Sequence, residues 1–146
     1  MAERGRDVRR PQEQLDDLFS DIWQVPGFAG IRHGFRPHVD CYTSDEPRTI
    51  TVVVELPGVQ PSDVHVAVAE RELMVSGVRH RPAVPDRRSF HQMEIEFGPF
   101  QRRIILSEEV DPERAKASYE QGMLTIVLPV ATRTPSGRVS IEVKRA

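Results

Sequence analysis

The sequence predicts an all-β fold, and three observations support that class. Valine and isoleucine together number 26, against 7 leucines, in a chain of 146 residues. β-Branched side chains fit a pleated strand better than a helix, whereas helical bundles rely on leucine. Twelve prolines and nine glycines interrupt the chain often, and apolar residues alternate with polar ones between these breaks. The expected architecture is one immunoglobulin-like antiparallel β-sandwich with two short arms.

Residues 1–36 are expected to form an N-terminal arm, partly helical and partly disordered. Apolar residues between positions 15 and 23 recur at i, i+3, i+4, i+7 and i+8, as in an amphipathic helix, and Pro26 and Gly27 end it. The helix either packs on its own domain or meets other chains, and exposed apolar patches mark interaction surfaces. The candidate contact residues are Leu15, Leu18, Phe19, Ile22, Trp23, Phe28 and Phe35.

Residues 37–129 are expected to form the sandwich. Alternating runs predict strands near 50–56, 64–69, 73–77, 92–97, 100–106 and 124–128. The segment 79–89 contains two prolines and predicts a long exposed loop. Arg102 shares the strand parity of Phe100 and Ile104. A charge on the apolar side of a strand needs a partner, and the alternative is a solvated arginine at a sheet edge.

Residues 130–146 are expected to form a flexible C-terminal tail. A segment rich in Thr, Arg, Pro, Ser and Gly comes first, followed by an alternating run that carries Ile141 and Val143. The stretch from Pro129 to Ile141 spans at most roughly 40 Å when extended, which is enough to reach a neighbouring subunit. The alternative is a frayed tail with no binding role.

The composition and the absence of known motifs argue against several classes of protein, namely nucleic-acid-binding proteins, membrane proteins and enzymes. The net charge of −2 gives no global attraction to nucleic acid, and no apolar run approaches the ~20 residues of a membrane helix. The first twenty residues lack an apolar signal core, and Cys41 has no cysteine to pair with, which favours the cytoplasm. No phosphate-binding loop, metal-ligand spacing or catalytic constellation is present. We therefore expect no enzyme activity, cofactor, metal, membrane or nucleic-acid partner.

Four segments in order resemble the small heat shock proteins of the bacterial type, which share the α-crystallin domain. These segments are Phe35–Asp40, Val54–Val59, Ala117–Leu124 and Ile141–Val143. The chain departs from the family pattern at two places. Gln121 stands where Asn is frequent, so that Gly122 is expected to make the turn alone, and Ser107 stands where proline is frequent.

The resemblance implies an ATP-independent holdase chaperone, a homo-oligomer built from dimers that binds partly unfolded client proteins and leaves refolding to nucleotide-driven chaperones. The arm residues would bind clients. A strand over His91–Phe97, with Met93, Ile95 and Phe97 on one face, would cross to a partner's sheet; the alternative is an ordinary strand in its own sheet. Arg102 is expected to pair with acidic groups, and Ile141 and Val143 to enter a groove between edge strands of another subunit. The other function considered is a co-chaperone or adaptor with one defined protein partner.

Overall fold

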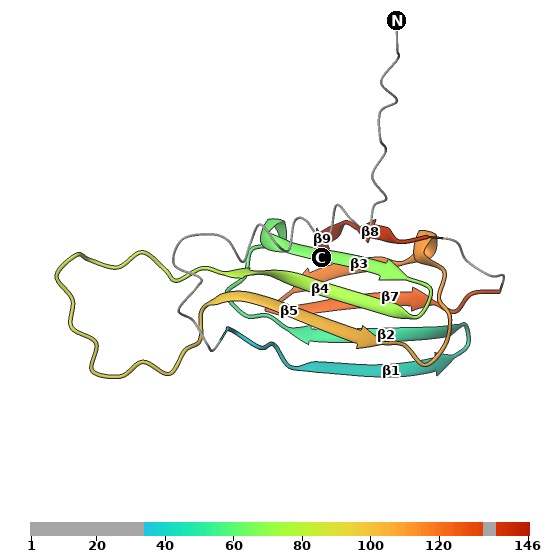
Figure 1. Ribbon diagram of the computed structural model, residues 1–146, viewed down its shortest axis with the longest axis horizontal. Coiled ribbons are helices and arrows are strands. Elements are labelled where there is room, and N and C mark those ends of the chain that lie inside the picture. The colour runs from blue at the N-terminus through green and yellow to red at the C-terminus, as the bar shows by residue number, and fades with distance from the viewer. Residues whose placement is uncertain (1–33, 133–136) are drawn as a thin grey trace, which may run out of the picture. The chain divides into compact units, whose positions relative to one another are not determined.

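The computed structural model describes residues 34–132 and 137–146, and within these ranges nine strands form two facing sheets (Figure 1). The expected all-β sandwich is therefore confirmed. The expected helix at 15–23 lies outside the described residues. The strands are β1 Val39–Asp45, β2 Arg48–Glu55, β3 Val64–Ala69, β4 Glu72–Arg79, β5 Gly98–Ile105, β6 Lys116–Glu120, β7 Met123–Pro129, β8 Val139–Ile141 and β9 Val143–Arg145.

The two sheets contain five and four strands. The larger has the order β1-β2-β7-β6-β9 and the smaller β5-β4-β3-β8. All pairs are antiparallel except β6 with β9. Two short 3₁₀ turns, η1 Pro61–Asp63 and η2 Pro112–Arg114, precede β3 and β6. One side of the sandwich therefore ends in β8 and β9, and the other in β1 and β5.

The core lies between the sheets and is built from the alternation in the sequence. Ile50, Val52 and Val54 of β2 pair with Leu128, Ile126 and Leu124 of β7, and all six side chains are fully buried. Leu73 and Val75 of β4 are buried beside them. Each such side chain contributes about 1.5–3 kcal/mol when it leaves water. The hydrophobic alternation thus fixes which face of each strand points inward.

The turn between β6 and β7 uses two left-handed residues, not one. Gln121 has φ 51° and Gly122 has φ 80°, and they connect Glu120 to its partner Met123. Two-residue hairpin loops of this kind match the twist of antiparallel strands. The expectation that Gly122 makes the turn alone is wrong, because both central residues of this two-residue loop have positive φ, as a type I′ turn requires. A Cβ on Gly122 would also lie 3.0 Å from the Cα of Pro57.

Candidate protein-interaction surfaces

The C-terminal segment covers the side of the sandwich between β3 and β6. β8 pairs with β3 and places Ile141 opposite Val66, while β9 pairs with β6 and places Val143 opposite Ala117. Ile141 and Val143 are half-buried against the core. The family resemblance implied that these two residues enter a groove of another subunit, which stays a prediction. In this structure of a single chain they lie against the chain's own β3 and β6.

An ion-pair cluster lies where β8 begins. Arg103 of the adjacent strand forms an ion pair with the carboxylate of Glu72. Its Nε lies 2.6 Å from Oε1, and its Nη2 donates a 3.0 Å hydrogen bond to Oε2. Nη2 of Arg138 lies 3.9 Å from Oε2 of the same group. The side chains of Glu72 and Arg138 are each 19 % exposed, so water screens this pair less than a typical surface pair. The cluster joins the tail to β4 and β5.

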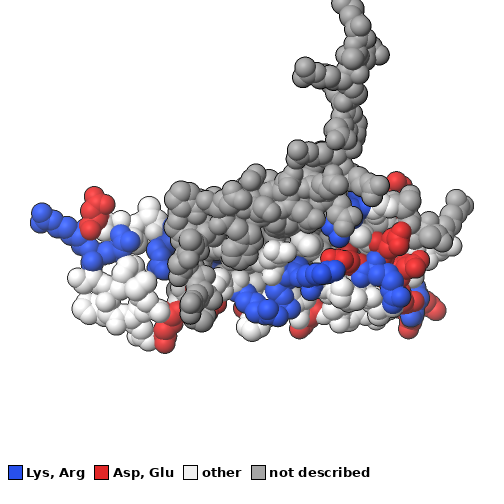
Figure 2. All heavy atoms as spheres, in the orientation of Figure 1, with Lys and Arg blue, Asp and Glu red and all other residues white. Residues whose placement is uncertain are grey.

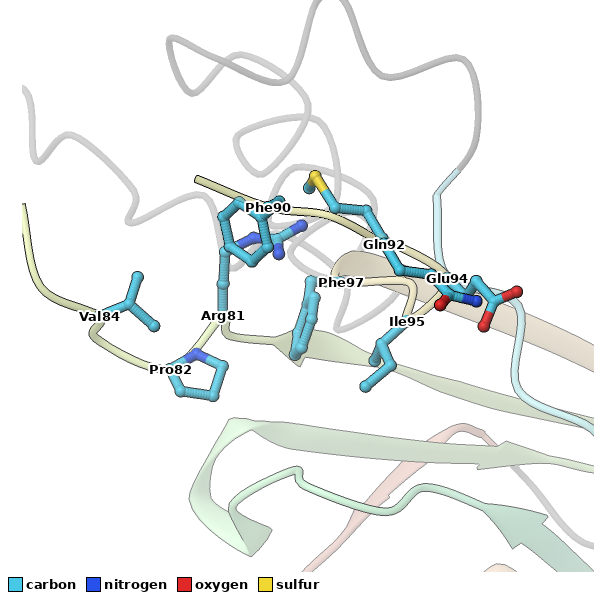
Figure 3. A pocket seen from close by; sticks show the side chains of 9 residues that line it. Arg81, Pro82, Val84, Phe90, Gln92, Glu94, Ile95 and Phe97 are labelled. Carbon is cyan, nitrogen blue, oxygen red and sulfur yellow. The ribbon is translucent and has the colours of Figure 1, made fainter. Parts of the chain in front are cut away.

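The 80–97 loop, which connects β4 to β5, carries large apolar side chains in solvent. It extends from one end of the sandwich in Figure 1, and uncharged side chains form much of its surface in Figure 2. Met93 is 61 % exposed, Ile95 68 % and Phe90 48 %. These residues line a shallow apolar pocket of about 210 Å³ together with Val84 and Phe97 (Figure 3). Such a surface on a folded domain favours contact with another protein.

The segment His91–Phe97 forms no strand in the described part of the chain. The prediction of an ordinary strand in its own sheet is therefore wrong, because none of the strands in residues 34–132 and 137–146 offers it a hydrogen-bonding ladder. The crossing to a partner's sheet stays a prediction.

The edge strand β1 is the second exposed surface. Val39 is half-buried, and the following six residues are exposed. β2 pairs with one side of β1, and no described strand pairs with the other side. Cys41 lies in this strand, exposed and free, and partial burial raises the pKa of its thiol above the ordinary value. An edge with unpaired backbone groups is a template for a further strand.

Phe35 belongs to the core of the domain. It is 9 % exposed, and its ring meets that of Phe100 edge-on, with centroids 5.7 Å apart. The guanidinium of Arg79 lies 3.6 Å above the Phe35 ring. The sequence assignment of Phe35 to an exposed client-binding arm is thus wrong for the folded domain, because the ring is covered on its face and edge. The other assigned arm residues, Leu15, Leu18, Phe19, Ile22, Trp23 and Phe28, lie outside the described residues.

Arg79 is the functional candidate that sequence reasoning missed. Its Nε donates a 2.8 Å hydrogen bond to the carbonyl of Glu96, Nη2 donates to the same oxygen, and Nη1 reaches the carbonyl of Pro57 at 3.4 Å. Burial lowers its pKa, and the carboxylates of Glu96 and Glu55 act in the opposite direction. The signal was in the sequence, because Arg79 shares the inward parity of Leu73 and Val75.

Arg102 has a backbone partner where the family resemblance implied acidic ones. The guanidinium donates to the carbonyl of Pro37 at 2.5 Å and pairs with no carboxylate among the described residues. Burial and the neighbouring charge of Arg36 both lower its pKa. The pairing of Arg102 with acidic groups, which the resemblance implies, stays a prediction.

No metal-binding cluster or membrane helix was found in the described ranges. His, Cys, Asp and Glu side chains there form no group of three or more that could hold a metal ion. None of their helices has the length and apolar character needed to cross a membrane. Lys/Arg and Asp/Glu atoms intermingle over the sandwich on the face that Figure 2 shows.

Comparison with known proteins agrees with this geometry. Residues 42–144 match the Hsp20/alpha crystallin family. The chain belongs to that family. It is 36 % identical over 136 residues to the 16.9 kDa class I heat shock protein 1 of Triticum aestivum, covering 85 % of this chain and 89 % of the relative. Membership gives this small heat shock protein a chaperone role.

Two solved structures resemble the fold. Heat shock protein 16.0 from Schizosaccharomyces pombe superposes with a TM-score of 0.61 at 28 % identity, over 70 % of this chain and 92 % of that one. A small heat-shock protein from Xylella fastidiosa superposes with a TM-score of 0.60 at 27 % identity, over 73 % of this chain and 96 % of that one. Both likenesses extend over most of the other protein's chain.

Proposed function

We propose that this small heat shock protein is an ATP-independent holdase, which binds partly unfolded proteins and prevents their aggregation. The observation that carries the proposal is the match of residues 42–144 to the Hsp20/alpha crystallin family, and the exposed apolar side chains of the 80–97 loop add that this domain has a surface suited to binding other proteins. Chaperones that accept many clients need adaptable apolar contacts rather than a shaped pocket. Refolding would then require other chaperones that consume nucleotide.

The first assembly step is a dimer formed through the loop. The segment His91–Phe97 and the strand β1 have equal lengths of seven residues, and β1 has an edge with which no described strand pairs. In the proposed dimer the segment of one chain pairs with β1 of the other, and Met93, Ile95 and Phe97 leave water together. Burying a fully exposed side chain of this size is worth about 1.5–3 kcal/mol, so that each of these partly covered residues would stabilise the dimer by less than that. Arg102 lies on the same side of the sandwich, where an acidic group of the second chain would complete its pairing.

Larger assemblies would form when Ile141 and Val143 enter the groove between β3 and β6 of a neighbouring subunit. The solved Xylella fastidiosa relative has a distinct high order structure, which supports a homo-oligomer. The arm residues Leu15, Leu18, Phe19, Ile22, Trp23 and Phe28 remain our candidates for client binding. The free thiol of Cys41 suits a reducing compartment, so the cytoplasm is the proposed location.

Light scattering from a heat-labile client, without ATP, tests the holdase activity. We expect the wild-type protein to suppress aggregation at roughly stoichiometric amounts, and Trp23→Ser to weaken suppression while the melting temperature of the domain stays unchanged. A wild-type protein that leaves the scattering of the client unchanged would overturn the proposal.

The loop offers a closely matched pair of variants for the dimer. Ile95 and Ile105 are both 68 % exposed, but only Ile95 lies in the loop. Sizing by sedimentation should show that Ile95→Asp dissociates the dimer and that Ile105→Asp does not. Equal behaviour of the two variants would contradict the assigned interface.

The tail is tested in the same assay. Replacing Ile141 and Val143 with serine should reduce large assemblies to dimers, whereas Glu142→Ser, which changes the exposed residue between them, should leave the particle size unchanged. Particles of unchanged size in the double variant would exclude the tail from assembly.

A further inference from the structure

Arg79 lies at the neck of the 80–97 loop. It is the last residue of β4, and it is in register with Gly98, the first residue of β5. The chain therefore leaves the sheet and returns to it at this pair. Arg79 is only 8 % exposed, which is rare for an arginine, and no carboxylate of the described residues forms an ion pair with it. A buried guanidinium at such a position is held there by specific contacts.

Three separate segments meet at this guanidinium. Its hydrogen bonds to the carbonyl of Glu96 hold the returning end of the loop, and the bond to Pro57 reaches the connection after β2. Its flat face covers the ring of Phe35 at 3.6 Å, and the ring of Phe97 lies at 5.6 Å. Lysine cannot reproduce this arrangement, because it lacks both the planar fork of donors and the stacking face.

We propose that Arg79 is a positioning residue for the loop that carries the dimer contact, and that it couples the loop to the segment that enters the domain at Phe35. The proposal rests on the dimer described above. With the neck fixed at Arg79 and Glu96, the residues between them leave the sandwich in one direction, so that the segment ending at Phe97 is presented to a second chain. Loosening the neck lets the loop sample more directions, and the entropy lost on binding rises.

The test compares Arg79→Lys with Arg81→Lys in the full chain. Arg81 also lies over aromatic rings, at 4.6 Å from Phe97 and 5.8 Å from Phe90, but it is exposed and holds no backbone carbonyl in the described structure. We expect Arg79→Lys to raise the dimer dissociation constant about tenfold, the effect of losing charge-assisted hydrogen bonds. Arg81→Lys should change it less than twofold. Sedimentation over a dilution series measures both constants.

A purely structural role would give a different result. In that case Arg79→Lys lowers the melting temperature while the dissociation constant stays at the wild-type value, and the inference is overturned. Phe35→Leu supplies a second route if the lysine variant fails to fold, because it keeps an apolar core side chain but removes the stacked ring. Its dissociation constant should also rise, and a wild-type value would overturn the coupling.

The outcomes also separate this inference from the proposed dimer. If Ile95→Asp leaves the dimer intact, the loop is not the contact and the proposed assembly fails with it. If Ile95→Asp dissociates the dimer and Arg79→Lys does not, the assembly stands and only the role of Arg79 is wrong.

Discussion

Replacing Gly77 with alanine should destabilise the sandwich strongly, because the position has no room for a side chain. A Cβ there would lie 2.2 Å from the backbone oxygen of Asp63 and 2.7 Å from Cζ of Phe100. Real Cβ contacts essentially never fall below 3.0 Å. Relieving the contact with the Asp63 oxygen, which lies at 2.2 Å, therefore requires a shift of about 0.8 Å, in addition to any movement of the Phe100 ring. This oxygen belongs to η1, whose Asp63 amide is hydrogen-bonded to Gln60 at 2.9 Å.

The two neighbours of Gly77 cannot easily yield, since one is backbone and the other is a core ring packed against Phe35. We therefore place the cost at the upper end for overpacking, about 3 kcal/mol. For a domain of this size that lowers the melting temperature by roughly 10–15 °C. Thermal unfolding followed by circular dichroism, at one fixed protein concentration, measures the change.

Gly98→Ala is the matched control for backbone strain. A Cβ on Gly98 would meet nothing within 4 Å, but its φ is +117°, so that only the backbone conformation opposes alanine, at a cost of about 1–3 kcal/mol. Gly77 carries no positive φ, so its alanine variant reports sterics alone. A melting temperature for Gly77→Ala within 3 °C of the wild type would refute the steric argument.

Three further predictions concern the turn, the tail and the thiol. Gln121→Gly should raise the melting temperature by a few degrees, because glycine adopts positive φ without the ~1 kcal/mol cost that glutamine bears; a lower melting temperature would contradict this. Glu72→Gln should weaken the contact with Arg138 and raise the hydrogen-exchange rate of the β8 amides about two- to fivefold. The control variant Lys144→Gln should leave that rate unchanged. Equal exchange rates in the two variants would show that the Glu72–Arg138 ion pair does not hold the tail on the sandwich. Cys41 should react with iodoacetamide more slowly at pH 8 than a free thiol, because its raised pKa leaves less thiolate, and the rate should still increase above pH 9. A rate equal to that of free cysteine would show that burial does not protect it.

Hydrophobic alternation made most of the fold predictable. The runs at Ile50–Leu56, Val64–Ala69 and Leu124–Leu128 alternate regularly, and each is a strand with the expected face inward. β1 was not recognised, because an edge strand with six exposed residues has no apolar face to show in its sequence. β6 was missed for a related reason, since only Ala117 in it is buried.

The candidate surfaces were less predictable, because they depend on contacts between distant segments. The sequence singled out Met93 and Ile95, which lie exposed in the loop, but not the guanidinium at its neck. Arg79 meets Phe35 and Glu96, which lie 44 and 17 positions away. Alternation indicates that Arg79 points inward, but it cannot indicate that the ring of Phe35 and the carbonyl of Glu96 lie within contact distance of its guanidinium. The same applies to Arg102, whose partner is a main-chain oxygen.

The tail that lies along β3 and β6 has a consequence for how assembly responds to dilution. A neighbour's tail in this groove would make the contacts that the chain's own Ile141 and Val143 make now, so exchanging one for the other costs no contact free energy. The balance is then a competition between the effective concentration of a tethered segment, about millimolar for short linkers, and the concentration of tails from other subunits. Dilution therefore favours the state in which each chain's own tail fills its groove, and a high subunit concentration favours the state in which tails fill the grooves of neighbouring subunits.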